Sequence, residues 1–244
     1  MTVQQILDYM RLRYDAYASQ DAPGYDDDDL VSLFNKAQKV FAKSLYNEFG
    51  NPTRKGAEES EKRSKDLVQL KAHDVISLTP PFAVGDHPNS YFVDLPLDFW
   101  VTLKEELDIT YTNSCGETVS DSRIPVKPIR EDYYNANVKN PYKRPYEELV
   151  WRFDRERDDI NSQVSPTNSK RNEIILFDGA TPDNYRVSYY RAPRNIDLTD
   201  PNTFCEFDEM HHEKIADLAV ELAMQTTDRP GLQSKMIENS KIIE

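Results

Sequence analysis

Glycine, cysteine and long apolar runs are scarce in this sequence, and each shortage argues against a class of protein. Seven glycines among 244 residues provide no glycine-rich loop for nucleotide phosphates. Two cysteines, Cys115 and Cys205, cannot form a disulfide framework, so a reducing compartment is expected. No stretch approaches the roughly 18 consecutive apolar residues of a membrane-spanning helix, and the first residues lack the features of a signal peptide. We therefore expect no membrane association, and a protein that stays in the cytoplasm or leaves it within a particle.

Basic residues are also in the minority. The 43 aspartates and glutamates exceed the 30 lysines and arginines, which gives a formal net charge of −13 at pH 7. Tight binding to nucleic acid of any sequence needs a cationic face, so this function is disfavoured. A negatively charged surface would instead let DNA pass close by without adhering to it.

Helical periodicity dominates residues 1–72. Thr2 and Gln5 have the spacing of a capping box, and an apolar face follows at Val3, Ile6, Leu7 and Met10. The aspartate run at 26–29 precedes a second helical pattern over 30–45, and acidic residues favour the positive end of a helix dipole. Residues 50–52 predict a stop, and the polar range 55–71 predicts a third, exposed helix.

Between residues 73 and 200 the pattern changes to that of β-strands. Alternating apolar residues predict strands at 91–95, 101–111, 149–153, 173–177 and 185–190. Glu105 interrupts the second of these, and a helix is the competing interpretation there. The range 123–129 contains prolines, which predicts an edge strand. The polar range 154–172 predicts a long exposed connection, and 178–184 predicts a turn.

Residues 201–244 return to a helical pattern. Asp208 is the expected N-cap of a helix whose apolar face contains Ile215, Leu218, Ala219, Leu222 and Ala223. Residues 227–231 break this helix, and a short helix or tail is expected from Leu232 onwards. The order of elements predicts an α+β fold, in which N-terminal helices and a returning C-terminal helix form a helical bundle next to a central, mostly antiparallel β domain. The expected parts of the chain are 1–72, 73–200 and 201–244.

Two groups of residues invite a metal interpretation, but their spacing is unsuitable. A structural zinc site needs four ligands in paired short spacings, whereas Cys205 is followed by the adjacent His211 and His212, which point about 100° apart on a helix. Four consecutive aspartates at 26–29 lack the alternating oxygens of a calcium loop. We therefore expect no metal and no cofactor, with Cys205 buried as a small residue and the aspartates capping a helix.

The sequence contains none of the local motifs of serine hydrolases, zinc proteases, phosphate loops or dinucleotide sites. A nucleophilic Cys115 or Cys205 would need a nearby base and an orienting group, and four histidines offer few candidates. We expect that the protein is not an enzyme. One catalytic alternative stays open, a metal-dependent hydrolase whose scattered carboxylates meet in space.

The range 131–145, EDYYNANVKNPYKRP, interleaves tyrosines with basic residues and prolines. Such a loop can stack on single-stranded nucleic acid, but tyrosine and arginine are also enriched at protein interfaces, which suits an acidic chain better. The plain alternative is a loop whose rings only cover the sheet. The predicted assembly interface consists of Tyr133, Tyr134, Tyr142, Lys143, Arg144 and Tyr146, together with Arg229, Leu232 and Met236 in the C-terminal tail.

Four phrases, in this order along the chain, are typical of one lineage. They are LPLDFW at 95–100, VKNPYKRP at 138–145, RVSYYRAPRNIDL at 186–198, and FCEF at 204–207 followed by HHEKIADLAVELAM at 211–224. The chain thereby resembles the head–tail adaptor proteins, also called neck ring or tail tubular proteins, of short-tailed bacteriophages, most closely those of crAss-like phages. It departs from their pattern at Phe207, where an aliphatic residue and a proline are common, and in the long range 154–172.

The resemblance implies a structural virion protein without catalytic residues. Members form rings, usually of twelve copies, that dock on the portal protein at the neck of the virion and extend the DNA channel towards the tail. The implied partners are other copies of the chain, the portal, a further tail or ring protein, and genomic DNA that passes through the lumen during ejection without sequence-specific binding. The alternatives from other classes are the metal-dependent hydrolase and a small protein-binding module that uses the tyrosine-rich loop.

Two hypotheses follow for such a ring. The excess negative charge faces the lumen, so that DNA slides past a repulsive wall. The tail after Arg229 is extended and inserts into a neighbouring ring protein, because few core positions follow the break at 230–231.

Overall fold

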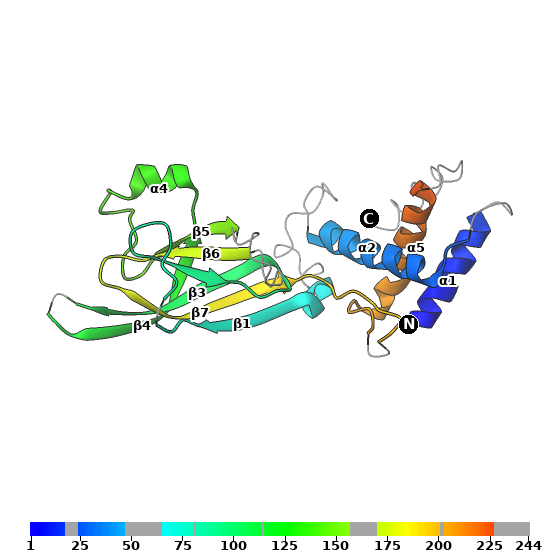
Figure 1. Cartoon of the computed structure of the whole chain (residues 1–244), viewed down its shortest axis with the longest axis horizontal. Coiled ribbons are helices and arrows are strands. Elements are labelled where there is room, and N and C mark those ends of the chain that lie inside the picture. The colour runs from blue at the N-terminus through cyan, green and yellow to red at the C-terminus, as the bar shows by residue number, and fades with distance from the viewer. Residues whose placement is uncertain are drawn as a thin grey trace. The chain divides into compact units, whose positions relative to one another are not determined.

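The structure, a computed structural model, describes residues 1–17, 24–46, 65–80, 82–113, 115–156, 170–200 and 203–226. Helices combine with a seven-stranded, mostly antiparallel sheet, which confirms the α+β class. The chain divides into two compact units, Met1–Leu70 with Ala192–Glu244, and Lys71–Arg191 (Figure 1). We call them the helical unit and the β unit. The division into three parts at residues 72 and 200 stays a prediction.

The helical unit contains α1 (Val3–Tyr17), α2 (Asp27–Tyr46), a short 3-10 helix (Val68–Leu70) and α5 (Glu209–Thr226). The predicted capping box is present at the start of α1. Thr2 N donates to Gln5 Oε1 at 2.8 Å, and Gln5 N donates to Thr2 Oγ1 at 3.3 Å. The predicted apolar face is buried through Ile6, Leu7 and Met10. Two reciprocal hydrogen bonds between Thr2 and Gln5 therefore stabilise the first turn of α1.

The other two long helices also begin where the sequence indicates. Asp27, Asp28 and Asp29 occupy the first turn of α2, where their charges favour the helix dipole. Asp208 precedes α5, and its Oδ1 accepts a hydrogen bond from Met210 N at 3.2 Å. The predicted capping role of Asp208 is thus confirmed, and the aspartate run lies at the start of a helix as predicted.

Specific contacts join α2 to the linker that precedes α5. Phe41 of α2 meets Phe207 edge to face, with ring centroids 5.3 Å apart. Asn35 of α2 binds the linker at Ile196: its Nδ2 donates to Ile196 O at 3.0 Å, and its Oδ1 accepts from Ile196 N at 2.7 Å. One amide side chain therefore satisfies both backbone groups of Ile196, where the linker has no strand partner.

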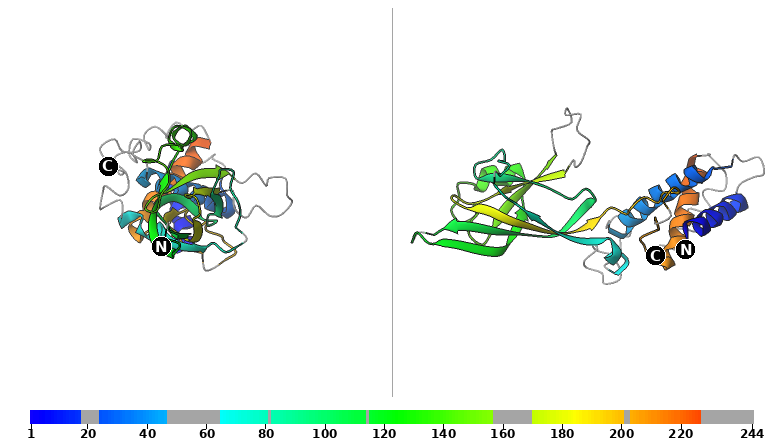
Figure 2. Two further views of the ribbon diagram at one scale, coloured as in Figure 1. Left: turned by 90° about the vertical axis from the view of Figure 1, so that its left-hand side faces the viewer. Right: turned by 60° about the horizontal axis from the view of Figure 1, so that its bottom comes forward.

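The β unit contains β1 (Lys71–Ser77), β2 (Ser90–Asp94), β3 (Phe99–Thr112), β4 (Thr118–Pro128), α4 (Glu131–Asn137), β5 (Val150–Glu156), β6 (Lys170–Ile175) and β7 (Thr181–Arg191). The strand order is β1-β7-β3-β4-β5-β6-β2, and every neighbouring pair is antiparallel except β4 and β5. Figure 2 shows the twist and curl of this sheet. Its core contains Leu107, Ile109, Leu176, Tyr185 and Val187, all buried.

All five predicted strands are present, but three local predictions are wrong. β4 is not an edge strand along its whole length, because Val126–Pro128 pair with β5. The helix α4 occupies the start of the predicted aromatic loop, since acidic residues lie in its first turn and tyrosines pack beneath it. β7 begins inside the predicted turn, because Thr181 already pairs with Thr110 of β3. β1 has no predicted counterpart, because most of its side chains are exposed and alternate weakly.

Several predictions fall on residues outside the described ranges. They are the stop at 50–52, most of the proposed helix at 55–71, much of the connection at 154–172, and the break and tail from residue 227. Within the range 55–71 the structure describes residues 65–71: residues 65–66 are helical, the 3-10 helix Val68–Leu70 follows, and Lys71 already belongs to β1.

The two outer strands of the sheet are protected in different ways. A segment before β2 covers that strand, with Phe92 N donating to Ala83 O at 2.7 Å and Gly85 N donating to Ser90 O at 2.9 Å. In β1, the side chain of Asp74 accepts from the backbone N–H of its neighbour Val75 at 2.8 Å. An acidic side chain thus occupies a donor that an added strand would need.

A buried charged pair lies in the interior of the β unit. Arg152 of β5 donates to Glu105 of β3, and both side chains are less than one-tenth exposed. Asn172 of β6 donates to Glu105 Oε1 at 3.2 Å and to the Tyr185 hydroxyl at 2.9 Å, and that hydroxyl donates to Glu105. Burial and the Glu105 carboxylate raise the pKa of Tyr185 well above its usual value, so the phenol stays a donor. Side chains of β5, β6 and β7 therefore all donate hydrogen bonds to the Glu105 carboxylate of β3.

Replacing Arg152 tests how strongly the folded state depends on the Arg152–Glu105 pair. Arg152→Ala leaves Glu105 buried without its cation, and we expect a loss of about 3–5 kcal/mol in the free energy of unfolding, measured by urea denaturation. Arg171→Ala is the matched control: Arg171 pairs with the half-exposed Asp94 at 2.7 Å, so its loss should cost at most about 1 kcal/mol. Equal effects of the two substitutions would contradict the assignment.

Candidate assembly surface

The candidate surface is the segment that connects β4 to β5. It begins with α4, whose first turn contains Glu131 and Asp132, and which ends where Val138 N donates to Tyr134 O at 2.8 Å. Asn140 then organises a turn, since its Oδ1 accepts from Tyr142 N at 3.0 Å and its carbonyl accepts from Arg144 N at 3.0 Å. We call residues 140–146 the Tyr142 loop.

The rings of α4 face the sheet. Tyr133 and Tyr134 are half-buried and lie edge-on to Trp151, with centroid distances of 5.6 and 6.2 Å, and Tyr134 also meets Phe153 at 5.8 Å. The Lys127 ammonium lies 4.9 Å from the centre of the Tyr133 ring. Burial raises the pKa of Tyr134, and the charges of Glu173 and Glu131 act in the same direction. These two predicted interface residues therefore anchor the segment to the sheet.

The Tyr142 loop faces solvent. The Tyr142 side chain is 92% exposed and that of Tyr146 is 45% exposed, and Lys143 and Arg144 are exposed as well. Among the described residues, no carboxylate forms an ion pair with Lys143, Arg144 or the nearby Lys139. The loop thus presents an aromatic ring together with unpaired positive charge.

A groove of about 650 Å³ lies beside this loop. Three predicted residues line it, Tyr134, Arg144 and Tyr146, together with Pro88, Asn89, Val138, Pro141, Pro145, Glu147, Glu148 and residues 175–178. The structure therefore brings together the predicted residues of the β unit on one segment. Tyr133 and Tyr134 pack against the sheet, whereas Tyr142, Lys143, Arg144 and Tyr146 are exposed. Arg229, Leu232 and Met236 lie outside the described residues.

A buried carboxylate supports α4 from below. Glu173 of β6 is fully buried and accepts hydrogen bonds from Ser90 Oγ at 2.7 Å, His87 N at 2.8 Å and Arg155 Nε at 2.8 Å. Arg155 also binds Glu131 of α4 at 3.0 Å. The His87 ring stacks on Phe153 at 4.8 Å and meets Tyr134 edge-on at 4.5 Å. This cluster ties the start of α4 to β5 and β6.

The charge of Glu173 is stabilised despite its burial. Burial alone would raise the pKa of this carboxyl, but the hydrogen bonds from Ser90, the His87 amide and Arg155 outweigh it and lower the pKa to about 2. The close approach of Gly85 leaves no room for a larger residue there, because a Cβ would lie 2.7 Å from Glu173 Oε1. The cluster is therefore compact as well as fully hydrogen-bonded.

The residues once considered for metal binding have other neighbours. His212 Nε2 lies 2.9 Å from Phe207 O, and His211 Nε2 lies 3.3 Å from Asp66 Oδ1. Within the described residues, no group of three or more His, Cys, Asp or Glu side chains could hold a metal ion. Burial raises the pKa of Cys205 to about 11, so its thiol is not an activated nucleophile. None of the described helices is both long and apolar enough to cross a membrane.

An α+β chain with a firmly anchored, solvent-facing aromatic and basic loop has the character of an assembly protein. Comparison with known proteins gives the particular family. The model of the family "Phage tail ring protein 3/4" matches residues 1–233, so the chain belongs to this family of structural ring proteins. It is 26% identical over 239 residues to "Ring protein 4/5" of Bacteroides phage crAss001, covering 91% of this chain and 92% of that relative. The resemblance to ring proteins of crAss-like phages is confirmed.

Sequence reasoning found the exposed part of the surface but missed its supports. His87 and Glu173 lie 86 positions apart in the sequence, and neither belongs to a motif. The only sequence signal for Glu173 is a carboxylate at the start of an apolar strand, and many exposed strand ends share that feature. Lys139, which lies just before the Tyr142 loop, is exposed and does not belong to the predicted interface.

The hydrogen bonds of Glu173 predict a specific acid sensitivity. Because its folded pKa is about 2 and its ordinary value is 4.5, its contribution is complete above pH 4.5 and is lost as the pH falls towards 2. We expect the native protein to lose up to about 3 kcal/mol more over this range than Glu173→Gln. Urea denaturation at several pH values measures this. The exposed control Glu148→Gln should keep the native pH dependence; if it and Glu173→Gln behave alike, the assignment is wrong.

Replacement of the half-buried Tyr134 and of the exposed Tyr142 should have different effects on the free energy of unfolding. Tyr134→Ala removes a half-buried ring from Trp151, Phe153 and His87, and should cost about 1–3 kcal/mol of unfolding free energy. Tyr142→Ala removes an exposed ring and should stay within about 0.5 kcal/mol of the native protein. Thermal and urea denaturation of both variants check this, and a large loss for Tyr142→Ala would contradict the solvent-facing position of that ring.

Proposed function

We propose that this chain forms a ring at the head–tail junction of a virion, docks on the portal protein and extends the DNA channel towards the tail. Membership of the tail ring family over residues 1–233 is the observation that carries the proposal. The exposed, anchored Tyr142 loop supports it, because tyrosine and arginine are typical of binding hot spots. The chain acts in this proposal as a structural part of the neck, not as an enzyme.

A closed ring requires two different surfaces on each subunit. Head-to-tail contacts close by rotation, so one surface must complement another that does not resemble it. We propose twelve copies, and a helical bundle in each, formed by α1, α2 and the returning α5. The ring contact of Phe41 on α2 with His211 on α5, with centroids 5.3 Å apart, supports that arrangement of helices. So does the hydrogen bond from the Tyr25 hydroxyl, just before α2, to the carbonyl of Ala223 on α5 at 2.9 Å.

The charge of the chain suits a channel for DNA. A net charge of −13 per subunit becomes large in a ring of many copies, and DNA is itself a dense polyanion. We propose that the excess acidic residues face the lumen, where repulsion keeps DNA from adhering during ejection. We also propose that the tail after Arg229 inserts into a neighbouring tail or ring protein.

Electron microscopy of the chain co-expressed with the portal of the same phage tests the proposal. We expect closed rings of twelve copies on the portal, with an acidic lumen. A chain ending at Asp228 is the matched variant for the tail: it should form the same ring but bind its neighbouring ring or tail protein more weakly. A monomer that does not bind the portal, and whose melting temperature rises when a divalent metal ion is added, would instead favour the metal-dependent hydrolase. A basic lumen would refute the charge hypothesis alone.

A further inference from the structure

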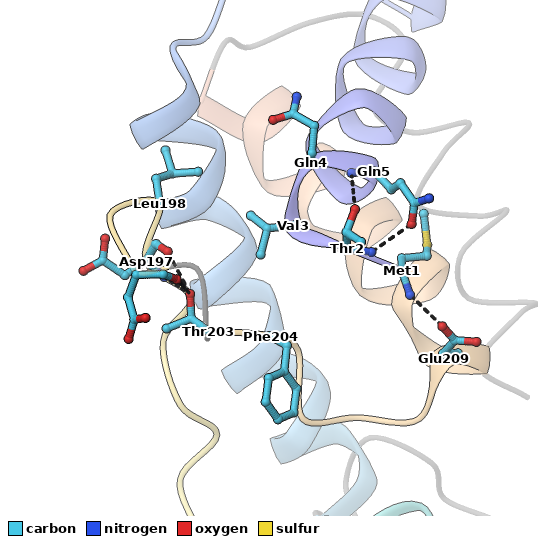
Figure 3. A pocket seen from close by; sticks show the side chains of 11 residues that line it. Met1, Thr2, Val3, Gln4, Gln5, Asp197, Leu198, Thr203, Phe204 and Glu209 are labelled. Carbon is cyan, nitrogen blue, oxygen red and sulfur yellow. Dashed lines mark hydrogen bonds and ion pairs between the residues drawn. The ribbon is translucent and has the colours of Figure 1, made fainter.

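Besides the groove beside the Tyr142 loop in the β unit, the protein has a groove with exposed apolar side chains in the helical unit, which we call the Phe204 groove. It has a volume of about 600 Å³ and lies between the start of α1 and the linker that precedes α5. Figure 3 shows Val3 on the α1 side and Leu198 and Phe204 on the linker side. The Phe204 side chain is 68% exposed and that of Leu198 is 40% exposed. Two large apolar side chains thus face solvent within one concave surface.

Both walls of the groove are held in place by hydrogen bonds. On the linker, Thr203 Oγ1 donates to Asp197 O at 2.7 Å and accepts from Asp197 N at 3.1 Å. The Asp197 carboxylate accepts from Thr199 N and Thr199 Oγ1, each at 2.8 Å, and these bonds lower its pKa. On the other side, the capping box fixes the first turn of α1. The groove is therefore formed before any partner arrives.

The charge of the groove is negative. Asp197, Asp200 and Glu209 line it, and no lysine or arginine belongs to its described lining. The cation in its wall is the ammonium of Met1, which lies 2.9 Å from Glu209 Oε1. A groove with exposed apolar rings and excess carboxylate is complementary to a segment that carries an aromatic ring next to basic groups.

The Tyr142 loop has this composition. Tyr142 is almost fully exposed, and it lies next to Lys143 and Arg144 with Lys139 nearby in the sequence. These cations are unpaired among the described residues, whereas each of four other arginines of the β unit, Arg152, Arg155, Arg171 and Arg186, lies within 4.0 Å of a carboxylate. The loop therefore combines an exposed aromatic ring with positive charges that no described carboxylate neutralises.

We propose that the Tyr142 loop of one copy docks into the Phe204 groove of the neighbouring copy, with Tyr142 against Phe204 and Leu198 and the basic side chains facing Asp197 and Asp200. This inference rests on the proposed ring. The two surfaces differ from each other and belong to different compact units, so their contact is head to tail and can close by rotation. The groove volume of about 600 Å³ lies in the range that buries a small ligand, and accommodates one tyrosine with its neighbours.

Cysteine cross-linking tests the contact directly. In a background of Cys115→Ser, one tagged chain carries Tyr142→Cys and a second, differently tagged chain carries Leu198→Cys; Cys205 is retained because it is buried. Rings assembled from the mixture on the portal should give cross-linked pairs that contain both tags after oxidation. The control pairs Tyr142→Cys with Leu12→Cys on α1, which is 70% exposed but does not line the groove. Its yield should be at least about tenfold lower.

Charge reversal gives an independent measurement. Arg144→Asp and Asp200→Lys should each weaken ring assembly roughly tenfold, because each places like charges across the contact. Combined in one chain, they restore opposite charges and should return assembly to within about threefold of the native level. Rescue by the pair is not expected if the residues act separately on folding.

The outcomes separate this inference from the proposed function. Rings that form normally but give no Tyr142–Leu198 cross-link, or no charge rescue, overturn the inference and leave the ring intact. Cross-linking of the groove cysteine to a different ring protein overturns the choice of a second copy as occupant. Failure of the native chain to form rings on its portal overturns the proposed function itself.

Discussion

The buried pair of Glu105 and Arg152 is the interaction on which the β unit depends. Through direct hydrogen bonds the carboxylate joins β3 to β5, β6 and β7, although these strands are not all neighbours in the sheet. A charge in this position is costly unless every lone pair is used, and the polar side chains around Glu105 use them. The pair therefore connects β3 to strands that other strands separate from it in the sheet order, and one of them, β5, also contributes Arg155 to the support of α4.

The sequence indicated the strands well because their burial is periodic, but it could not indicate this pair. Glu105 interrupts the apolar alternation of β3, and no neighbouring residue in the sequence indicates that Arg152 of β5 binds it. The same limit applies to Glu173, whose partners come from distant segments. Capping residues such as Thr2, Gln5 and Asp208 were predictable because their hydrogen bonds span only a few residues. Local chemistry is legible in one sequence, whereas long-range polar contacts are not.

The candidate assembly surface shows the same difference between local and long-range contacts. The exposed residues of the Tyr142 loop were recognisable by composition, since tyrosine and basic residues are interleaved there. The distinction between Tyr134, which supports, and Tyr142, which projects, depends on Trp151 and Phe153 beneath the helix. The Phe204 groove was not predictable, because its walls come from opposite ends of the helical unit in sequence. An anchored loop and a preformed groove both lower the entropy lost on contact.

The hydrogen bond between Asp74 and the backbone of Val75 has a consequence for the life of the free subunit. An outer strand with open backbone donors is a template on which another chain can pair. The carboxylate at β1 occupies one such donor and places charge where an incoming strand would lie. One backbone donor of the outer strand is thus removed from ladder pairing, which favours recognition between chains through side chains.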